Sequence, residues 1–447
     1  MTSSQYEEQF KKLTDIGSVG RGKSKHRPRN APELYGGQYP FIQTGDVKHS
    51  NFYITSYTQT YNEKGLAQSK LWQPGTLCIT IAANIADTAI LGIPACFPDS
   101  IIGFVPKKGV SDVKFIKYCL ETYKQQIQSI SQGTTQDNLS IEKLLSIRLR
   151  VPLFAVQQKI ASILSAYDDL IENNNRRIAV LEKMAEEIYR EWFVRFRFPG
   201  YEKVRFIKGI PDGWHVRRFH EIVEHYIGGG WGDDNQSTSF CEGSFVIRGT
   251  DIPHVQAGEL KGCPYRFHKS SNLKSRKLQP DDFVFEVSGG SKDQLLGRNV
   301  LVTERVLNFF DAPVIAASFC KQIRFRRELA SPYFMKYFLK LYYEYDLVGI
   351  YQVQSTGISN YQFESFLKFQ TIILPPDDLQ KKFEDMIKPI IEMRDDVALA
   401  NIALRRTRDL LLPRLISGKL SVENLDIQFP PTMQDESANA DKEAACA

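Results

Sequence analysis

The chain has 447 residues, of which 42% are hydrophobic and 24% charged, and it carries a formal net charge of +5. The length favours two or more globular domains, and the hydrophobic content is enough for ordinary buried cores. The mild positive charge permits a polyanionic partner without requiring one, and no apolar run approaches the roughly 20 residues that a membrane span needs.

The N-terminal residues and the cysteines bear on the cellular compartment. Residues 1–10 lack the apolar stretch of a secretory signal. The seven cysteines are scattered, odd in number and never spaced as Cys-x-x-Cys, which argues against a disulfide framework and against a structural zinc site. We therefore expect a cytoplasmic protein that holds no metal.

Residues 1–152 are predicted to form a first domain of mixed α/β type. From about Thr14 to Arg150, short runs rich in Val, Ile, Tyr and Phe alternate with Gly, Pro, Asn and Asp, as half-buried strands and turns do. A helix is expected at 113–130, because the apolar residues there recur at helical spacing.

After Pro152 the pattern changes to heptads, which predicts a long helix within residues 153–196. Because a single helix would expose its apolar stripe, this helix needs a partner. Asn174 is expected to face a polar neighbour and to fix the register of the pair. The seam positions, at alternating spacings of four and three, are Ile160, Leu164, Tyr167, Ile171, Asn174, Ile178, Leu181, Ala185, Ile188 and Trp192.

The rest of the chain repeats this arrangement with a divergent sequence. A repeat just over two hundred residues long indicates tandem domains rather than a solenoid, so residues 197–375 are predicted to form a second domain of the same fold. Three segments return in the same order: FIQTGDV at 41–47 as VIRGTDI at 246–252, Gln73-Pro74 as Gln279-Pro280, and Val151-Pro152 before Gln157 as Leu374-Pro375 before Gln380.

A second long helix is predicted within residues 376–420, and residues 421–447 are expected to be disordered because they are polar and aperiodic. We expect the two helices to pair as an antiparallel coiled coil with pseudo-two-fold symmetry, which gives an α+β fold class. The apolar seam positions are Phe383, Ile387, Ile390, Val397, Leu404 and Leu411, and Arg394, Asn401 and Arg408 interrupt them.

Two segments of the first domain are candidates for contacts with nucleic acid. Residues 21–29 carry six basic side chains and no acid, so they can neutralise phosphates, although a solvated surface loop accounts for them equally well. Residues 131–138 are dense in Gln, Thr and Asn, which can bond to base edges. A polar turn that caps the next helix is the simpler interpretation of that segment alone, but the similar run at 352–360 favours a functional role.

The sequence contains no recognisable catalytic constellation. The seven histidines show no ligand spacing, and neither a Gly-x-Ser-x-Gly motif nor an adenine-methyltransferase Asn/Asp-Pro-Pro-Tyr/Phe loop occurs. Asp281, Asp282 and Glu286 could suggest a metal-dependent nuclease, but no lysine stands two residues after Glu286, and we interpret them as strand-edge carboxylates. We expect recognition without catalysis.

Three further segments resemble the specificity subunit of type I restriction-modification systems. LLPRLISGKL at 411–420 is similar to the end of that family's second helix, EWFVRF at 191–196 to the close of its first helix, and IPDGW at 210–214 to the opening of its second recognition domain. The resemblance covers about Thr14 to Leu420 in the same order of domains and helices. Arg195 departs from the family, in which an acidic residue is common at this place.

The resemblance implies that each domain is a target-recognition domain that reads one half of an asymmetric, bipartite site in double-stranded DNA. The paired helices would set the spacer and dock two methyltransferase subunits, which bring S-adenosylmethionine. Separate restriction and translocase subunits would use ATP and Mg. This chain itself would hold no cofactor and no catalytic residue.

The position of each residue within its domain predicts which side chains contact DNA. In the first domain these are Lys23, Lys25, Arg27, Arg29, Gln43, Thr44, Gln132, Thr134, Thr135, Gln136 and Asn138. In the second they are Arg248, Thr250, Lys292, Arg298, Gln352, Gln354 and Ser355. Packing between the helices and with partner subunits is predicted for Ile160, Leu164, Ile171, Asn174, Ile178, Leu181, Ile188, Trp192, Phe383, Ile387, Val397, Leu404 and Leu411.

Two other classes of protein stay open at this point. One is a coiled-coil scaffold whose domains bind protein instead of nucleic acid. The other is a fused methyltransferase and endonuclease, which would need cofactor-binding and catalytic loops.

Overall fold

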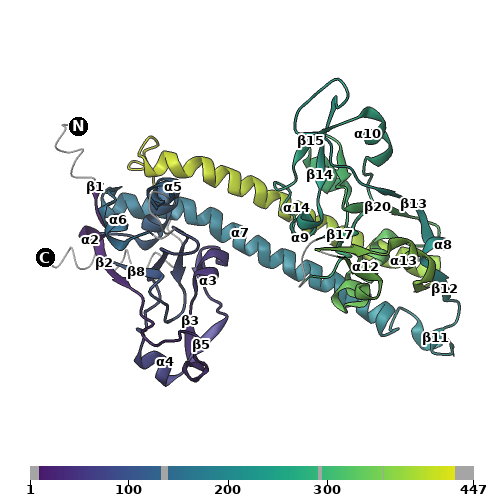
Figure 1. Cartoon of the computed structure of the whole chain (residues 1–447), viewed down its shortest axis with the longest axis horizontal. Coiled ribbons are helices and arrows are strands. Elements are labelled where there is room, and N and C mark those ends of the chain that lie inside the picture. The colour runs from purple at the N-terminus through teal and green to yellow at the C-terminus, as the bar shows by residue number, and fades with distance from the viewer. Residues whose placement is uncertain (1–9, 132–138, 290–293, 356, 428–447) are drawn as a thin grey trace. The chain divides into compact units, whose positions relative to one another are not determined.

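The computed structural model describes residues 10–131, 139–289, 294–355 and 357–427 (Figure 1). The chain forms two compact units: unit 1 comprises residues 1–172 and 404–447, and unit 2 comprises residues 173–403. Each unit contains one of the two predicted domains, called the first head and the second head below, and a stretch of both long helices. No helix in the described ranges is long and apolar enough to cross a bilayer.

The first head is built on a five-stranded sheet with helix α5 (Val113–Ser131) packed on it. The strands pair antiparallel except for β4 and β7, which are parallel. Strands β6 and β7 are buried throughout, as expected for apolar runs inside a sheet. The strand order is β2 (Gly17–Arg21), β8 (Ile101–Pro106), β6 (Leu77–Thr80), β7 (Thr88–Leu91) and β4 (Tyr53–Ile54).

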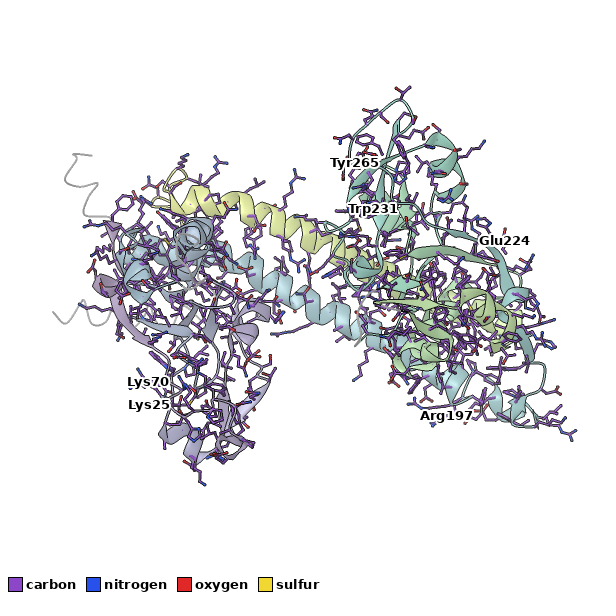
Figure 2. All side chains as sticks on the ribbon, in the orientation of Figure 1. Lys25, Lys70, Arg197, Glu224, Trp231 and Tyr265 are labelled. Carbon is purple, nitrogen blue, oxygen red and sulfur yellow. The ribbon has the colours of Figure 1, made fainter. Side chains whose placement is uncertain are left out.

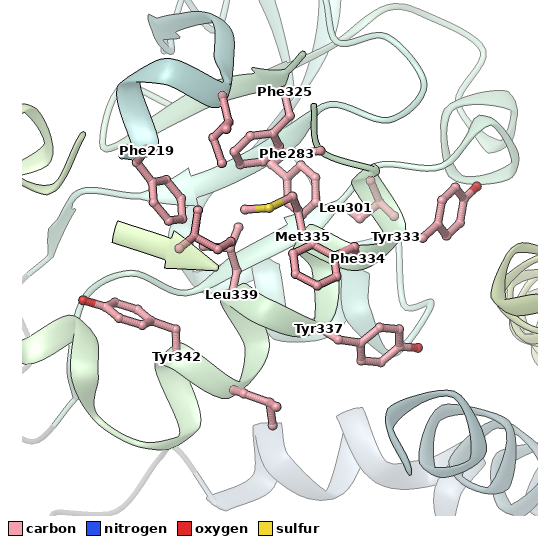
Figure 3. Close-up of a cluster of buried hydrophobic side chains, with 14 of the residues drawn as sticks. Phe219, Phe283, Leu301, Phe325, Tyr333, Phe334, Met335, Tyr337, Leu339 and Tyr342 are labelled. Atoms are coloured by element: carbon pink, nitrogen blue, oxygen red, sulfur yellow. The ribbon is translucent and has the colours of Figure 1, made fainter. Parts of the chain in front are cut away.

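The second head repeats this sheet with one strand fewer. Its order is β13 (Val223–Gly228), β20 (Cys320–Phe325), β16 (Phe283–Glu286) and β18 (Asn299–Leu301), and all pairs are antiparallel. Helix α12 (Pro332–Glu344) packs on the sheet through a cluster that includes Phe283, Phe325, Phe334 and Met335 (Figure 3). These strands and this helix stand in the same order as β2, β8, β6, β7 and α5, which confirms the predicted repeat.

Smaller elements also recur in both heads. The paired strands β1 (Phe10–Lys11) and β9 (Leu149–Arg150) correspond to β12 (His215–Arg218) and β23 (Thr371–Leu374). The pair β3 (Tyr35–Phe41) and β5 (Gln59–Tyr61) corresponds to β14 (Glu242–Ile247) and β15 (Tyr265–His268). Strand β19 (Val314–Ala316) joins β14 in parallel. The remaining strands of the second head are β10 (Phe206–Ile207), β11 (Ile210–Pro211), β17 (Ser288–Gly289), β21 (Gln352–Ser355) and β22 (Ile358–Tyr361).

Short helices connect these strands. In the first head they are α2 (Leu13–Ile16), η1 (Pro32–Leu34), α3 (Thr44–His49), α4 (Glu63–Ala67) and α6 (Ile141–Ser146). In the second head they are η3 (Tyr201–Lys203), α8 (Phe219–Ile222), η4 (Gly249–Asp251), α9 (Ile252–Gln256), α10 (Ser270–Arg276), α11 (Glu304–Phe309), η5 (Leu347–Tyr351) and α13 (Phe363–Phe369).

The two long helices are α7 (Phe154–Tyr189), which ends in the π-helical turn η2 (Arg190–Val194), and α14 (Asp377–Ile416). In unit 1 the early residues Ile160 and Leu164 of α7 share a core with Leu415 and Ile416 at the end of α14. In unit 2 the late residue Trp192 packs on Phe383 near the start of α14. Early residues of α7 therefore contact late residues of α14, and late residues of α7 contact early residues of α14. This confirms antiparallel pairing of the two helices.

The predicted seam is buried toward the helix ends and partly polar between them. Ile160, Leu164, Ile171, Leu181, Trp192, Phe383 and Ile387 are buried, whereas Ile178, Ile188, Val397, Leu404 and Leu411 are half-buried. Asn174 donates from Nδ2 to Oδ1 of Asn401 at 2.8 Å, and Asn401 donates to Oδ1 of Asn175 at 2.9 Å. The expected polar neighbour of Asn174 is thus another asparagine of the seam.

The second helix continues through Pro413 to Ile416, within its predicted bounds of residues 376–420. Pro413 cannot donate a backbone hydrogen bond, and proline usually breaks a helix interior. Here the final turn is retained, since Leu415 and Ile416 pack into the buried core of unit 1. Tertiary packing therefore outweighs the local preference of proline.

A buried glutamine joins the start of each long helix to its head. Gln157 donates to the carbonyl oxygens of Pro152 (2.8 Å) and Val110 (2.9 Å) and accepts from the backbone N–H of Asp112 (3.0 Å), just before α5. Gln380 makes the equivalent bonds to Pro375, Leu329 and Ser331. The repeated glutamine thus satisfies three backbone groups that would otherwise be buried without partners.

Arg394, which interrupts the second seam, is buried against acids. It donates to Glu182 of α7 at 2.6 Å and pairs with Asp395, and Lys336 of α12 donates to the same Glu182 at 2.9 Å. Burial opposes the charge of Glu182, but the charges of Lys336 and Arg394 outweigh it and lower the pKa of its carboxyl group to about 2. Arg394 therefore replaces an apolar seam residue with a buried ionic contact between the two helices, in which the acids offset its charge.

Replacing Gln380 by leucine is expected to lower the free energy of unfolding by about 2 to 4 kcal/mol, because three buried backbone groups lose their partner. Urea unfolding followed by circular dichroism measures the change. The control is Lys381→Leu, an exposed neighbour on the same helix. Equal stability of the two variants would contradict the role given to Gln380.

Replacing Glu182 by glutamine should lower the free energy of unfolding by about 3 kcal/mol at neutral pH. The pKa of Glu182 is about 2 in the fold against an ordinary 4.5, so its contribution is present above pH 4.5 and is lost as the pH falls toward 2. The difference between wild type and Glu182→Gln should therefore shrink across this interval. Glu187→Gln, an exposed neighbour, is the control, and a pH-independent difference would contradict the assignment.

Candidate nucleic-acid interface

Residues 21–29, called the basic loop below, contain three arginines that form hydrogen bonds or ion pairs within the first head and so hold this loop in its conformation. Arg21 donates to the backbone carbonyl of Asp99 at 2.6 Å, and Arg29 pairs with the Asp99 carboxylate at 2.7 Å. Arg27 donates to the carbonyl oxygens of Ser24 and His26. Lys23 and Lys25 are exposed, and neither forms an ion pair among the residues that the structure describes. Of the predicted contacts in this loop, the two lysines are the most available to a phosphate.

A third lysine, Lys70, lies beside this loop. Ser69 donates to the carbonyl of Lys23 at 2.7 Å, and the N–H of His26 donates to Gln68 at 3.0 Å, so the loop is held against the segment after α4. The Lys70 ammonium lies 3.6 Å from the ring centre of the buried Trp72. Lys25 and Lys70 lie on the same part of the first head (Figure 2). We call Lys23, Lys25 and Lys70 the lysine patch.

The repeated FIQTGDV and VIRGTDI segments form the same turn. Asp46 accepts from the backbone N–H of Gln43 at 2.8 Å, and Asp251 accepts from that of Arg248 at 2.9 Å, so each acid caps a short helix. The aspartates therefore recur for a structural reason. The residues around them differ: Gln43 is exposed and donates to Gln59, whereas Thr44 is half-buried.

In the second head the same turn carries an arginine. Arg248 binds Asp251 through two nitrogens, at 2.8 and 2.7 Å, and donates to the carbonyl of Gly262 at 3.0 Å. Hydrogen bonding to Asp251 raises the pKa of the guanidinium, which remains charged. Thr250 is exposed beside it. A Cβ on Gly249 would lie 2.4 Å from Oε1 of Glu286, so only glycine allows this close approach.

Two of the three carboxylates interpreted as strand-edge groups are instead buried: Glu286 is the last residue of β16 and Asp282 directly precedes this strand, whereas Asp281 is half-buried. Strand β16 lies between β20 and β18, and the Glu286 and Asp282 side chains are 5% and 0% exposed. Arg298 binds Glu286 from Nε at 2.8 Å, and Arg324 binds Asp282 at 2.7 Å. The two guanidinium groups compensate the burial of the two acids. Arg298, predicted to contact DNA, is itself only 13% exposed and is held inside the fold by Glu286.

A pocket of about 640 Å³ opens beside the Arg248 turn. Its lining includes Arg248, Thr250 and two aromatic residues, Trp231 and Phe319, which are 40% and 58% exposed. The guanidinium of Arg266 lies 4.4 Å from the ring centre of Trp231. Guanidinium, hydroxyl and aromatic groups together are suited to contacting base edges and base faces. Figure 2 labels Trp231. Trp231 was not among the predicted contact residues, because the sequence shows only an isolated tryptophan in a glycine-rich segment there.

The other predicted contacts divide into three groups. Gln352 accepts from the backbone N–H of Leu296 at 2.9 Å and so supports a neighbouring loop, whereas Gln354 is exposed. The side chain of Ser355 lies outside the described residues. Gln132, Thr134, Thr135, Gln136, Asn138 and Lys292 lie outside the described ranges altogether, as does most of the predicted disordered tail.

These observations define a class of protein: two copies of one domain, each carried on paired helices, with the same internal scaffold and different exposed side chains. Within the described ranges no group of three or more His, Cys, Asp or Glu residues is arranged to hold a metal ion.

Comparison with known proteins places the chain within that class. Residues 6–183 match the family described as the type I restriction modification DNA specificity domain. The type I restriction enzyme MjaIX specificity subunit of Methanocaldococcus jannaschii is 28% identical over 430 residues, which cover 93% of this chain and 94% of that protein. The MjaVIII specificity subunit of the same organism is 22% identical over 87% of this chain and 88% of that protein.

A solved structure has the same fold. The type I restriction-modification system S subunit from M. genitalium superposes with a TM-score of 0.56 at 14% identity, over 91% of this chain and 95% of that one. Residues 6–183 thus match a type I restriction modification DNA specificity domain, and nearly the whole chain is similar to specificity subunits of type I restriction enzymes.

Removing two charges of the lysine patch with Lys25→Ala and Lys70→Ala should weaken DNA binding by the assembled complex on all sequences alike. The slope of log K against log salt should become shallower by about 1 to 2, since each lost phosphate contact releases about one counterion fewer. Fluorescence anisotropy across a salt series measures this slope. Lys64→Ala with Lys107→Ala removes two exposed charges elsewhere on the same head, and an identical effect there would contradict the patch.

Proposed function

We propose that the two heads read the two halves of an asymmetric, bipartite sequence in double-stranded DNA. One observation carries the proposal: equivalent turns on one scaffold present Gln43 and Thr44 in the first head and Arg248 and Thr250 in the second. Different donors and acceptors at the same place select different bases. The lysine patch supplies phosphate contacts, and the Trp231 pocket supplies an aromatic face.

We further propose that the long helices dock two methyltransferase subunits. Apolar side chains are exposed on both helices at Leu170, Val180, Met184, Met393 and Leu410, and exposed apolar residues on a helix pair favour association with a protein partner. In this proposal the methyltransferase subunits bind S-adenosylmethionine and modify adenine, and separate restriction subunits use ATP and Mg to cleave. This chain is non-catalytic and works in the cytoplasm with its DNA.

The test is to co-express this chain with its methyltransferase subunit and to map methylated adenines across the host genome by single-molecule sequencing. A split motif with a fixed gap is expected. Gln43→Ala should relax the base preference of one half-site and Thr250→Ala that of the other, each by about 1 to 3 kcal/mol. Each variant is the control for the other. Relaxation of both halves by a single variant, or a continuous motif, would contradict the assignment of one half-site to each head.

A further inference from the structure

The two heads contact the long helices through the same dipeptide. Lys117-Tyr118 on α5 and Lys336-Tyr337 on α12 occupy equivalent places, each directly after two residues of the head core, Phe115-Ile116 and Phe334-Met335. From this dipeptide each head reaches an acid of α7 that also binds an arginine of α14. We call each set of groups a latch.

In the first latch the tyrosine makes the contact. The buried hydroxyl of Tyr118 donates to the carboxylate of Asp168, and Arg408 pairs with the same carboxylate. Burial, followed by the charge of Asp168, raises the pKa of Tyr118 well above its ordinary value, so the hydroxyl stays protonated and continues to donate. Lys117 points elsewhere and pairs with Glu121 on its own helix.

In the second latch the lysine makes the main contact. Lys336 donates to both oxygens of Glu182, at 2.9 and 3.1 Å, and Arg394 binds Oε1 of Glu182 at 2.6 Å. The hydroxyl of Tyr337 is 3.4 Å from the same carboxylate and makes the weaker contact. Figure 3 shows the Tyr337 side chain pointing away from the Phe283 and Phe325 rings of the head core.

Duplication alone does not account for the two latches. The repeat makes α7 equivalent to α14, with Gln157 matching Gln380, so the residue of α14 that corresponds to Asp168 is Ile391. Ile391 is buried in the apolar core and takes no part in a latch. Yet in both units the acid comes from α7 and the arginine from α14. The same constellation is therefore built from non-equivalent helix positions, which indicates a requirement shared by both heads.

A latch of this kind restricts the orientation of the head on the helices more than it adds to the free energy of folding. A buried ion pair often contributes no more to stability than apolar residues of the same volume, because desolvation offsets the attraction. Its hydrogen bonds are directional, however, and are lost when the partners rotate. We propose that Tyr118 and Lys336 are positioning residues that hold each head at one angle on the helix pair and so restrict the spacer between the two DNA half-sites. This inference rests on the proposed bipartite recognition.

The test compares full complexes of wild type, Tyr118→Phe and Lys336→Met on DNA whose half-sites are separated by the natural spacer or by one base pair more or fewer. Each variant should keep both half-site sequences. The preference for the natural spacer should fall by about ten- to a hundredfold, as expected for the loss of one hydrogen bond to a charged group. Lys336→Arg keeps a cation against Glu182 and should retain the wild-type preference.

Tyr342→Phe is the matched control, because this buried tyrosine of α12 donates to Gln370 within the second head at 2.7 Å and does not reach the helices. It should leave the spacer preference unchanged. If Tyr118→Phe and Lys336→Met lower the melting temperature but preserve the spacer preference, the latches only stabilise the fold and the inference is wrong. A wild-type complex without a split motif would instead overturn the proposed function together with it.

Discussion

The structure depends on the hydrogen bonds that satisfy backbone polar groups buried where a head meets the start of a long helix. Gln157 and Gln380 form these bonds in the same way, since each bonds to the loop before its long helix and to the N-terminus of the head helix that packs beside it. An unsatisfied buried donor or acceptor costs about 1 to 3 kcal/mol, so alternative joints between helix and head are disfavoured. The start of each long helix is thereby fixed to its own head.

The polar groups within the seam extend this constraint along the helices. Asn174 and Asn401 pair with each other, and Arg394 and Arg408 each pair with an acid of α7. An apolar seam alone tolerates shifts in register, whereas these pairs form in one register only. The helices thus act as a defined support for two domains whose exposed residues are free to differ. Shared scaffold and divergent surface are the basis of two-part recognition in the proposed function.

The sequence predicted the repeat, the mixed strand and helix content of the heads, and the starts of both long helices to within about one residue. These features depend on local patterns of apolar residues and turns, which a single sequence displays. Asn174 could be assigned a polar partner because a lone asparagine in an apolar seam is destabilising unless a polar group faces it. The contacts that retain the turn of α14 around Pro413 could not be predicted, since they come from residues distant in sequence.

The candidate site was predicted less completely, because exposure of a charged side chain depends on partners that the fold brings together. Arg298 appeared to be a surface cation, but Glu286 on the neighbouring strand binds it within the second head. Lys70 was missed because its proximity to the basic loop arises from hydrogen bonds across 42 and 46 residues of sequence. Trp231 gained its significance only when Arg266 and the pocket were seen around it.

The central claim is that one scaffold carries two independent reading surfaces. The most direct measurement is the methylation motif produced by a chain in which residues 215–374 are replaced by a copy of residues 10–150, mapped in the same host with the same methyltransferase subunit. The account predicts a split motif whose two halves are the same sequence in inverted orientation, equal to the half-site read by the first head. An unchanged asymmetric motif from this folded, methylating complex would contradict it.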